Sequence, residues 1–186
     1  MFLRKPARER DPLAVTMAGL RMGERTLQIG ISDAALTGVL AAKSGLSGNA
    51  AIAVPDDEHA ERARRACADA GVLAEILTGP LDTLAIDDGS TDVAIVHGSD
   101  AAIAGMSDAE RDRVFRECHR VLRIGGRLIV MSGGPDGGVT ALFHRRTNLP
   151  SLSAEQALAS YEHAGFRAAR LLAEREGMRF LEGLKG

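Results

Sequence analysis

Short apolar runs alternate with longer amphipathic segments along most of this chain, and that alternation constrains its fold more than any other feature. The strand-like runs lie at 25–30, 50–54, 72–77, 92–97 and 126–131. The helical patterns between them lie at 33–44, 57–70 and 107–122. Units of strand, helix and strand place their strands parallel in one sheet. The sequence therefore predicts an α/β fold with helices on both faces of a mostly parallel sheet.

Continuous apolar runs indicate which strands are covered on both faces. The first three runs and the run at 126–131 have this character. A leading helix is expected over 11–22, with Asp11 as its N-cap and Pro12 at its first helical position. Two further helices and two strands are expected in the C-terminal part, at 138–146, 153–164, 166–174 and 177–185. Because the linker between these strands is short enough for a hairpin, the last strand should run antiparallel to the rest.

Local signals mark several helix boundaries. Gly71 ends the second helix after "ADAG", and Ser107 with Glu110 forms a capping box at the start of the third. The "RIGG" segment at 123–126 is expected to close that third helix and turn directly into the next strand.

Length and composition indicate one ordinary domain. The chain has 186 residues, which is enough to bury a core and too few for a comfortable second domain. We therefore treat 1–186 as a single domain, with residues 1–22 as an N-terminal helical extension. Apolar residues make up 45% and charged residues 26%, the balance of a soluble globular protein.

Several classes of partner are not expected. The net charge of -2 gives no electrostatic attraction to nucleic acid. No apolar run approaches the roughly 20 residues of a membrane span. The opening "MFLRKPARER" lacks the apolar core of a signal peptide, so a cytoplasmic location is expected. Cys67 and Cys118 belong to no CxxC or Cys/His cluster, which favours reduced, packed thiols over a metal site.

Three segments give the chain a specific resemblance. "LTGPLDTLAIDDGSTDVAIV" at 77–96, "RVLRIGGRLIV" at 120–130 and the tail from residue 152 resemble, in this order and spacing, a class I S-adenosylmethionine-dependent methyltransferase of type 11. The resemblance implies a three-layer Rossmann-like sandwich. It also implies a seven-stranded sheet in the order 3-2-1-4-5-7-6, with the last strand antiparallel. S-adenosylmethionine would bind at the carboxyl ends of the strands.

The family's first cofactor loop reads D-x-G-x-G-x-G, where glycines let the backbone approach the methionine part of the cofactor. The matching positions here are Gln28, Gly30, Ser32 and Ala34. Ser32 is the serious departure, because its side chain would stand where the ligand's tail lies. An alternative is that Ser32 and Asp33 serve as N-cap residues of the following helix.

The family's ribose carboxylate, at the end of the second strand, is replaced by Val54. Asp56 and Asp57 follow closely, and either could swing back, but a carboxylate that opens a helix is more often its cap. After the third strand, the family's Gly-Asp pair, whose aspartate binds the adenine amino group, is replaced by Gly79 and Pro80.

These two losses can be weighed. Proline offers no acceptor side chain and no N–H, and Asp82, two residues on, is expected to be a solvated loop carboxylate. Losing both charge-assisted hydrogen bonds would remove about 3–6 kcal/mol of binding free energy. S-adenosylmethionine is therefore expected to bind weakly or not at all.

Histidines are the remaining candidates for chemistry. His97 opens the segment "HGSD" after the fourth strand, where the family often places acceptor-facing groups. It is either a general base or, as the stronger expectation, a packed residue. His59, His119 and His163 lie on helices with no partner at metal-ligand spacing and are expected to be solvated.

Three functions compete at this point. The chain is a methyltransferase with an unusual cofactor loop that acts on a small acceptor, or a non-catalytic relative that serves as an interaction or regulatory module for a protein partner. A nicotinamide-dependent oxidoreductase is the weakest hypothesis, because "GISDAA" supplies only the first glycine of G-x-G-x-x-G.

Overall fold

A computed structural model describes residues 12–45, 49–133 and 151–186 of the chain. The strands are β1 (Thr26–Ile29), β2 (Ala50–Val54), β3 (Glu75–Thr78), β4 (Thr91–His97), β5 (Leu122–Gly133), β6 (Arg167–Arg175) and β7 (Met178–Leu184). The helices are α1 (Pro12–Ala18), α2 (Ala34–Lys43), α3 (Asp57–Ala70), α4 (Ala101–Ala104), α5 (Asp108–Val121) and α6 (Ala154–His163).

All the strands form one seven-stranded sheet in the order β3-β2-β1-β4-β5-β7-β6. The pairs from β3 to β5 are parallel, and β7 pairs antiparallel with both β5 and β6. This confirms the predicted strand order and the antiparallel last strand. The order reverses between β1 and β4, so the carboxyl ends of these two central strands flank the switch point where ligands bind in such sheets.

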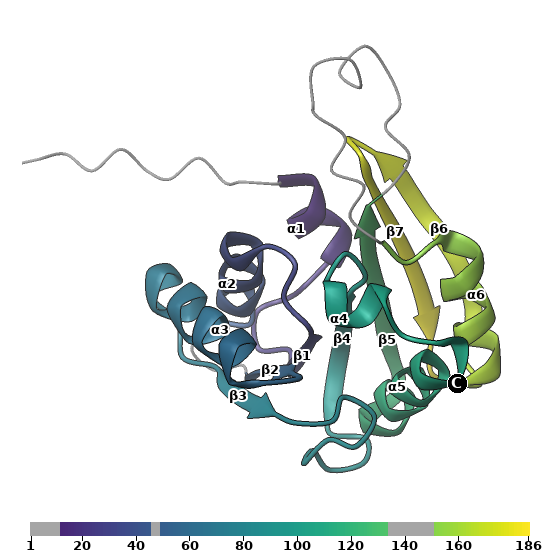
Figure 1. Cartoon of the computed structure of the whole chain (residues 1–186), viewed down its shortest axis with the longest axis horizontal. Helices are drawn as coiled ribbons and strands as arrows, with labels where there is room; N and C mark the ends of the chain where they lie inside the picture. The colour runs from purple at the N-terminus through teal and green to yellow at the C-terminus, as the bar shows by residue number, and fades with distance from the viewer. Residues whose placement is uncertain (1–11, 46–48, 134–150) are drawn as a thin grey trace, which may run out of the picture.

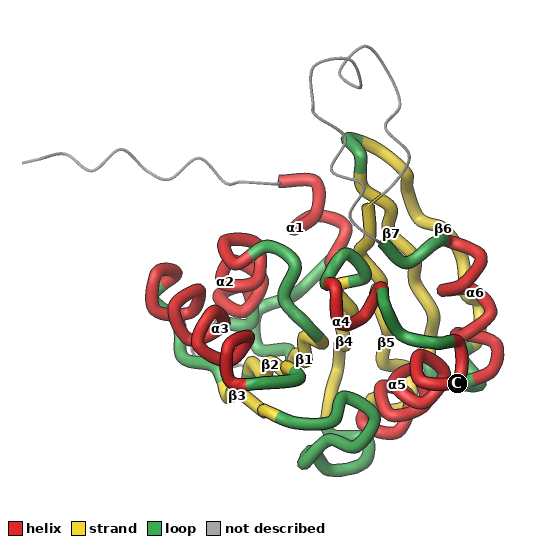
Figure 2. Tube along the Cα trace, viewed as in Figure 1, coloured by secondary structure: helices red, strands yellow, loops and turns green. Residues whose placement is uncertain are grey.

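The helices cover both faces of the sheet, as Figures 1 and 2 show. Apolar side chains of α5 and α6 form one core cluster with β1, β4 and β5. Those of α1 and α2 pack on the opposite face against β4, β5 and β7. A smaller cluster joins α3 and β2. The expected three-layer sandwich is therefore confirmed.

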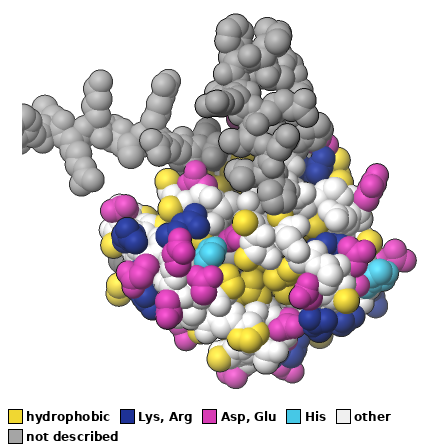
Figure 3. All heavy atoms as spheres, in the orientation of Figure 1, with side chains coloured by type: hydrophobic (Ala, Val, Ile, Leu, Met, Phe, Trp, Pro, Cys, Tyr) yellow, Lys and Arg dark blue, Asp and Glu magenta, His cyan; other side chains and the backbone are white. Residues whose placement is uncertain are grey.

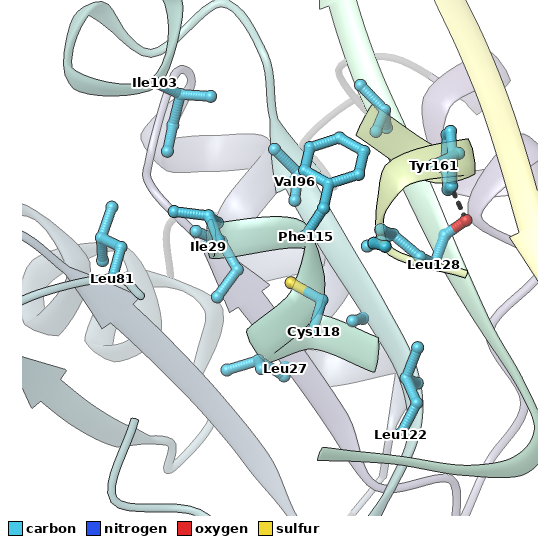
Figure 4. Packing of buried hydrophobic residues seen from close by; sticks show 14 of the residues in the cluster. Leu27, Ile29, Leu81, Val96, Ile103, Phe115, Cys118, Leu122, Leu128 and Tyr161 are labelled. Atoms are coloured by element: carbon cyan, nitrogen blue, oxygen red, sulfur yellow. Dashed lines mark hydrogen bonds between the residues drawn. The ribbon is translucent and has the colours of Figure 1, made fainter. Parts of the chain in front are cut away.

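Tyr161 of α6 is the largest side chain in the core beneath α5 and α6, and it is fully buried. Its ring packs edge-on against Phe115, with the ring centroids 5.2 Å apart. Its hydroxyl donates to the carbonyl oxygen of Leu128 at 2.8 Å, the bond drawn in Figure 4. The hydrogen bond offsets the cost of burying the hydroxyl, so the tyrosine fastens α6 to β5.

Several predicted boundaries are wrong. The leading helix begins at Pro12 as predicted but ends at Ala18 rather than 22. β3 runs over Glu75–Thr78 instead of 72–77 and is partly exposed, because within the described residues it is an edge strand whose one neighbour is β2. The "RIGG" segment does not form a separate turn: it lies within β5, where backbone bonds between Gly125, Gly126 and Lys185 hold it.

The remaining helix predictions have mixed outcomes. The capping box at the start of α5 and the cap of α3 by Gly71 are confirmed. The short helix α4 was not predicted. Asp11 and the helix expected at 138–146 lie outside the described residues. No helix in the described ranges is long and apolar enough to cross a membrane.

Gly38 sets how closely α2 approaches α3. A Cβ at this position would clash with the carbonyl oxygen of Ala66 and would lie 3.0 Å from the Cβ of Ala70. We expect Gly38→Ala to lower the free energy of unfolding by about 1–3 kcal/mol through overpacking, as measured by urea denaturation. This should occur although alanine is favoured over glycine in a helix by about 1 kcal/mol.

Ala35→Gly, at an exposed position of the same helix, is the matched control. It should destabilise by no more than about 1 kcal/mol, because it changes helix propensity without altering a helix crossing. A Gly38→Ala protein more stable than the parent would contradict the close approach of these helices.

Candidate cofactor site

The loop after β1 carries the one glycine kept from the family's first motif. Gly30 has a φ of +77°, which favours glycine, and its N–H donates to the carbonyl oxygen of Ala53 at 2.9 Å. A Cβ on Gly30 would lie 2.9 Å from Oδ2 of Asp100. Gly30 is therefore required both by its backbone conformation and by the close approach of this carboxylate.

Asp100 joins the end of β4 to the loop after β1. Its side chain is 1% exposed, and Oδ2 accepts a hydrogen bond from the N–H of Ile31 at 2.6 Å. The other oxygen, Oδ1, caps α4 by accepting from the N–H of Ala102 at 2.8 Å. Asp100 thus already binds one backbone N–H of this loop. In the methyltransferase family that the sequence resembles, the same loop faces the methionine part of the cofactor.

His97, the last residue of β4, is completely buried beside this loop. Its Nε2 lies 2.9 Å from Oε1 of Gln28. The amide nitrogen of Gln28 donates to the carbonyl oxygen of Thr37 at 3.0 Å, so Oε1 is an acceptor and the imidazole proton resides on Nε2. The remaining nitrogen, Nδ1, then accepts from the hydroxyl of Ser32 at 3.3 Å.

Burial dominates the titration of His97. It lowers the pKa of the imidazole from 6.5 to about 4, although the charges of Asp100 and Asp33 act in the opposite direction. The ring is therefore neutral at pH 7. The expectation that His97 is a packed residue is confirmed.

The structure at the start of α2 shows which of Ser32 and Asp33 is the N-cap of this helix. Asp33 is the N-cap, because its Oδ1 accepts from the N–H of Leu36 at 2.8 Å. Ser32 is exposed and does not cap the helix; its hydroxyl turns to His97 instead. Ala34 is the first residue of α2. Whether Ser32 and Ala34 contact a ligand stays a prediction.

The end of β2 carries no carboxylate. Val54 is fully buried in an apolar cluster that includes Ile31. Asp56 caps α3 by accepting from the N–H of His59 at 2.9 Å, so the cap interpretation is confirmed. That backbone bond, together with the His59 side chain, lowers the pKa of Asp56.

The expectation that His59 is solvated is wrong. Its side chain is 20% exposed, with Nδ1 lying 2.7 Å from Asp56 and Nε2 lying 4.0 Å from Oδ1 of Asp100. The turn at the start of α3 directs the imidazole toward the first loop. His119 is also partly buried and packs edge-on against Phe166, whereas His163 is largely exposed and pairs with Asp112.

Gly79 and Pro80 follow β3 at the third site. Gly79 has a φ of +145°, and its N–H donates to the carbonyl oxygen of Val54 at 3.0 Å. Pro80 is exposed. Asp82, expected to be solvated, instead accepts from Nε of Arg113 at 2.8 Å and is 28% exposed. Neither Pro80 nor Asp82 presents a free carboxylate where the family holds adenine.

A cleft of about 470 Å³ nevertheless opens between the ends of β2 and β3 and the helices α4 and α5. Its lining is mostly apolar and consists of Pro55, Gly79, Pro80, Leu81, Ala102, Gly105, Met106 and Glu110. Figure 3 shows hydrophobic side chains gathered near the centre of this face, with acidic side chains around them. Cavities of about 300–1,000 Å³ accommodate small organic ligands.

Glu110 is the carboxylate among the cleft-lining residues. It belongs to the capping box of α5, where its Oε2 accepts from the N–H of Ser107 at 2.8 Å and from its hydroxyl at 2.6 Å. These bonds lower the pKa of Glu110. The carboxylate is therefore fixed at the rim by the helix that carries it.

The described residues contain no group of three or more His, Cys, Asp or Glu side chains placed to hold a metal ion. Cys67 and Cys118 are both free and buried. Burial raises the pKa of Cys118 to about 12. These thiols are packed residues, as expected, and they lie apart from the cleft.

A profile of the family described as "Methyltransferase domain" matches residues 27–130. The match spans 104 of the 186 residues, from β1 to β5. The chain belongs to the class I S-adenosylmethionine-dependent methyltransferase family. No curated protein sequence matches it significantly.

Solved structures of methyltransferases share the fold. A S-adenosylmethionine-dependent methyltransferase from Aquifex aeolicus is 17% identical with a TM-score of 0.75, covering 98% of this chain and 94% of that one. One from Thermotoga maritima is 21% identical with a TM-score of 0.63, covering 92% and 87%. PigF, solved with SAH (S-adenosylhomocysteine), is 20% identical with a TM-score of 0.61, covering 88% and 51%. At these identities the likeness shows the fold alone.

The buried position of His97 in this methyltransferase domain predicts a pH dependence. The histidine of the unfolded chain titrates near 6.5 and that of the folded chain near 4, so the unfolded state takes up the proton first as the pH falls. Stability from the neutral ring should be complete above pH 6.5 and fall by about 3 kcal/mol as the pH drops through this window.

The measurement is urea denaturation of the parent and of His97→Gln at several pH values from 7 to 4. Carboxylates titrate in both proteins, so the difference between the two isolates His97. The parent should lose more stability than the variant over this range. An equal loss in both proteins would contradict the burial of a neutral imidazole.

Proposed function

We propose that this protein binds S-adenosylmethionine weakly, with the adenosyl group in the cleft beside β2, β3 and α4, and transfers its methyl group to a small acceptor. The observation that carries the proposal is the cleft itself, because it lies beside the carboxyl ends of the strands, where this family binds its cofactor. The family membership and the SAH present in the PigF structure support the choice of ligand.

The cleft suits an adenosyl group by its volume and by its mostly apolar lining. Leu81 and Met106 offer apolar surface for the faces of a base, and Pro80 adds a rigid rim. The polar anchors of the family are missing, since Val54 is buried in the core and Pro80 has no acceptor side chain. The fit of the base without these anchors is the reason for expecting weak affinity.

Methyl transfer asks little of the protein's own side chains. S-adenosylmethionine, when bound, supplies an electrophilic methyl group. The protein then has to align the acceptor with that group and to exclude water. His97 is completely buried, and its Nδ1 is directed at Ser32. A proton from an acceptor would therefore reach His97 only through the Ser32 hydroxyl.

A second candidate function is that of a non-catalytic module that binds a protein partner. One specific observation favours it: the carboxylate of Asp100 already satisfies the N–H of Ile31, a donor of the first loop. A site closed by its own side chain needs no cofactor for stability. For either function we place the protein in the cytoplasm, which rests on the sequence alone.

Calorimetric titration with S-adenosylmethionine and S-adenosylhomocysteine tests the proposal. The parent should bind with a dissociation constant near the millimolar range. Pro80→Asp places a carboxylate at the exposed rim of the cleft and should tighten binding about tenfold to a hundredfold, which corresponds to one charge-assisted hydrogen bond.

Pro80→Ala is the matched control, because it removes the proline ring without adding an acceptor. It should bind as the parent does. Absence of binding by both the parent and Pro80→Asp would reject the enzyme in favour of the non-catalytic module. Micromolar binding by the parent would show that the missing anchors have been replaced by other groups.

A further inference from the structure

We infer that this site selects 5′-thioadenosine ligands that lack an α-carboxylate, and that Asp100 is the residue that determines this specificity. The inference rests on the proposed function, since it assumes that the cleft holds the adenosyl group. It goes further by naming which 5′ side chain the neighbouring loop accepts.

Asp100 lies between the cleft and the loop after β1. It caps α4, whose second residue, Ala102, lines the cleft, and its other oxygen reaches the N–H of Ile31 at 2.6 Å. A ligand with its nucleoside in the cleft and its 5′ chain toward Gly30 therefore meets this carboxylate. The side chain is 1% exposed and accepts hydrogen bonds from two backbone donors, so its charge is held between the cleft and the loop.

A ligand carboxylate at this loop would compete with Asp100 for the same N–H. Two carboxylates that share a donor repel each other, most strongly where water is excluded. An amino group on the 5′ chain would instead be attracted to Asp100. The negative charge of Asp100 thus disfavours the carboxylate of S-adenosylhomocysteine and favours an amino group.

The basic side chains around the loop, His59 and Arg62, are already directed at groups of the protein. The Nδ1 of His59 contacts Asp56, and its Nε2 is 4.0 Å from Asp100. Arg62 donates to the carbonyl oxygen of Ile31 at 3.4 Å, on the acceptor side of the loop rather than the donor side. His59 faces two carboxylates of the protein, and Arg62 faces a carbonyl oxygen. A ligand carboxylate therefore gains little from them.

The test compares two ligands that differ only in the carboxylate. They are S-adenosylhomocysteine and its decarboxylated analogue, 5′-(3-aminopropylthio)-5′-deoxyadenosine, each titrated calorimetrically into the full chain. The parent should bind the decarboxylated analogue at least tenfold more tightly. Asp100→Asn removes the charge and keeps one acceptor oxygen, so one of the two backbone N–H groups, that of Ile31 or that of Ala102, loses its acceptor. In that variant the two affinities should come within about threefold of each other.

Asp82→Asn is the control, because Asp82 also follows a strand end but pairs with Arg113. It should leave the ratio of the two affinities unchanged. Parent binding of S-adenosylhomocysteine as tight as that of the analogue, or tighter, would overturn the inference and leave the proposed function standing. A preference that persists in Asp100→Asn would overturn the role of Asp100. Binding of neither ligand to the parent or to Asp100→Asn would overturn the proposed function, and this inference with it.

Discussion

The pairing of Gln28 with His97 is the interaction on which the centre of this fold depends. β1 and β4 are neighbouring strands, and at their carboxyl ends each carries a large polar side chain that is 1% exposed or less. Such groups destabilise a core unless each finds a partner. Here Gln28 and His97 are hydrogen-bonded to each other, and Gln28 also donates to a backbone carbonyl oxygen of α2. A polar connection therefore holds the switch point of the sheet together, where the family's sequence pattern places an aspartate and glycines.

The architecture could be predicted because it depends on periodicity and on local signals. The apolar runs of β1, β2 and β4, the Gly71 cap and the Ser107 capping box all act over a few residues. The errors at β3 and at "RIGG" occur where a distant segment decides the outcome. β3 is partly exposed because it lies at the edge of the sheet formed by the described residues, and "RIGG" stays in β5 because the backbone of Lys185 binds it.

The missing carboxylates of the candidate site could be predicted from the sequence, whereas the contacts of Asp100 and His59 could not. The absence of carboxylates at Val54 and Pro80 follows from the sequence alone. Asp100 is the last residue of the segment "HGSD", in which His97 was considered as a general base. Its position before "AAIA" is a helix-cap signal that would have indicated α4. Its bond to Ile31 spans 69 residues of sequence, so no local pattern reveals it. The inward orientation of His59 likewise depends on how α3 packs.

Asp100 has two structural roles, and they connect α4 to any ligand that binds at the first loop. The same carboxylate terminates α4 and closes the first loop. A molecule that displaced it from the loop would also withdraw the cap from a helix of only four residues. Displacement of Asp100 and the order of α4 are thus thermodynamically linked: a molecule that takes the N–H of Ile31 from Asp100 loosens the helix beside the cleft, and whatever stabilises α4 keeps Asp100 on the loop.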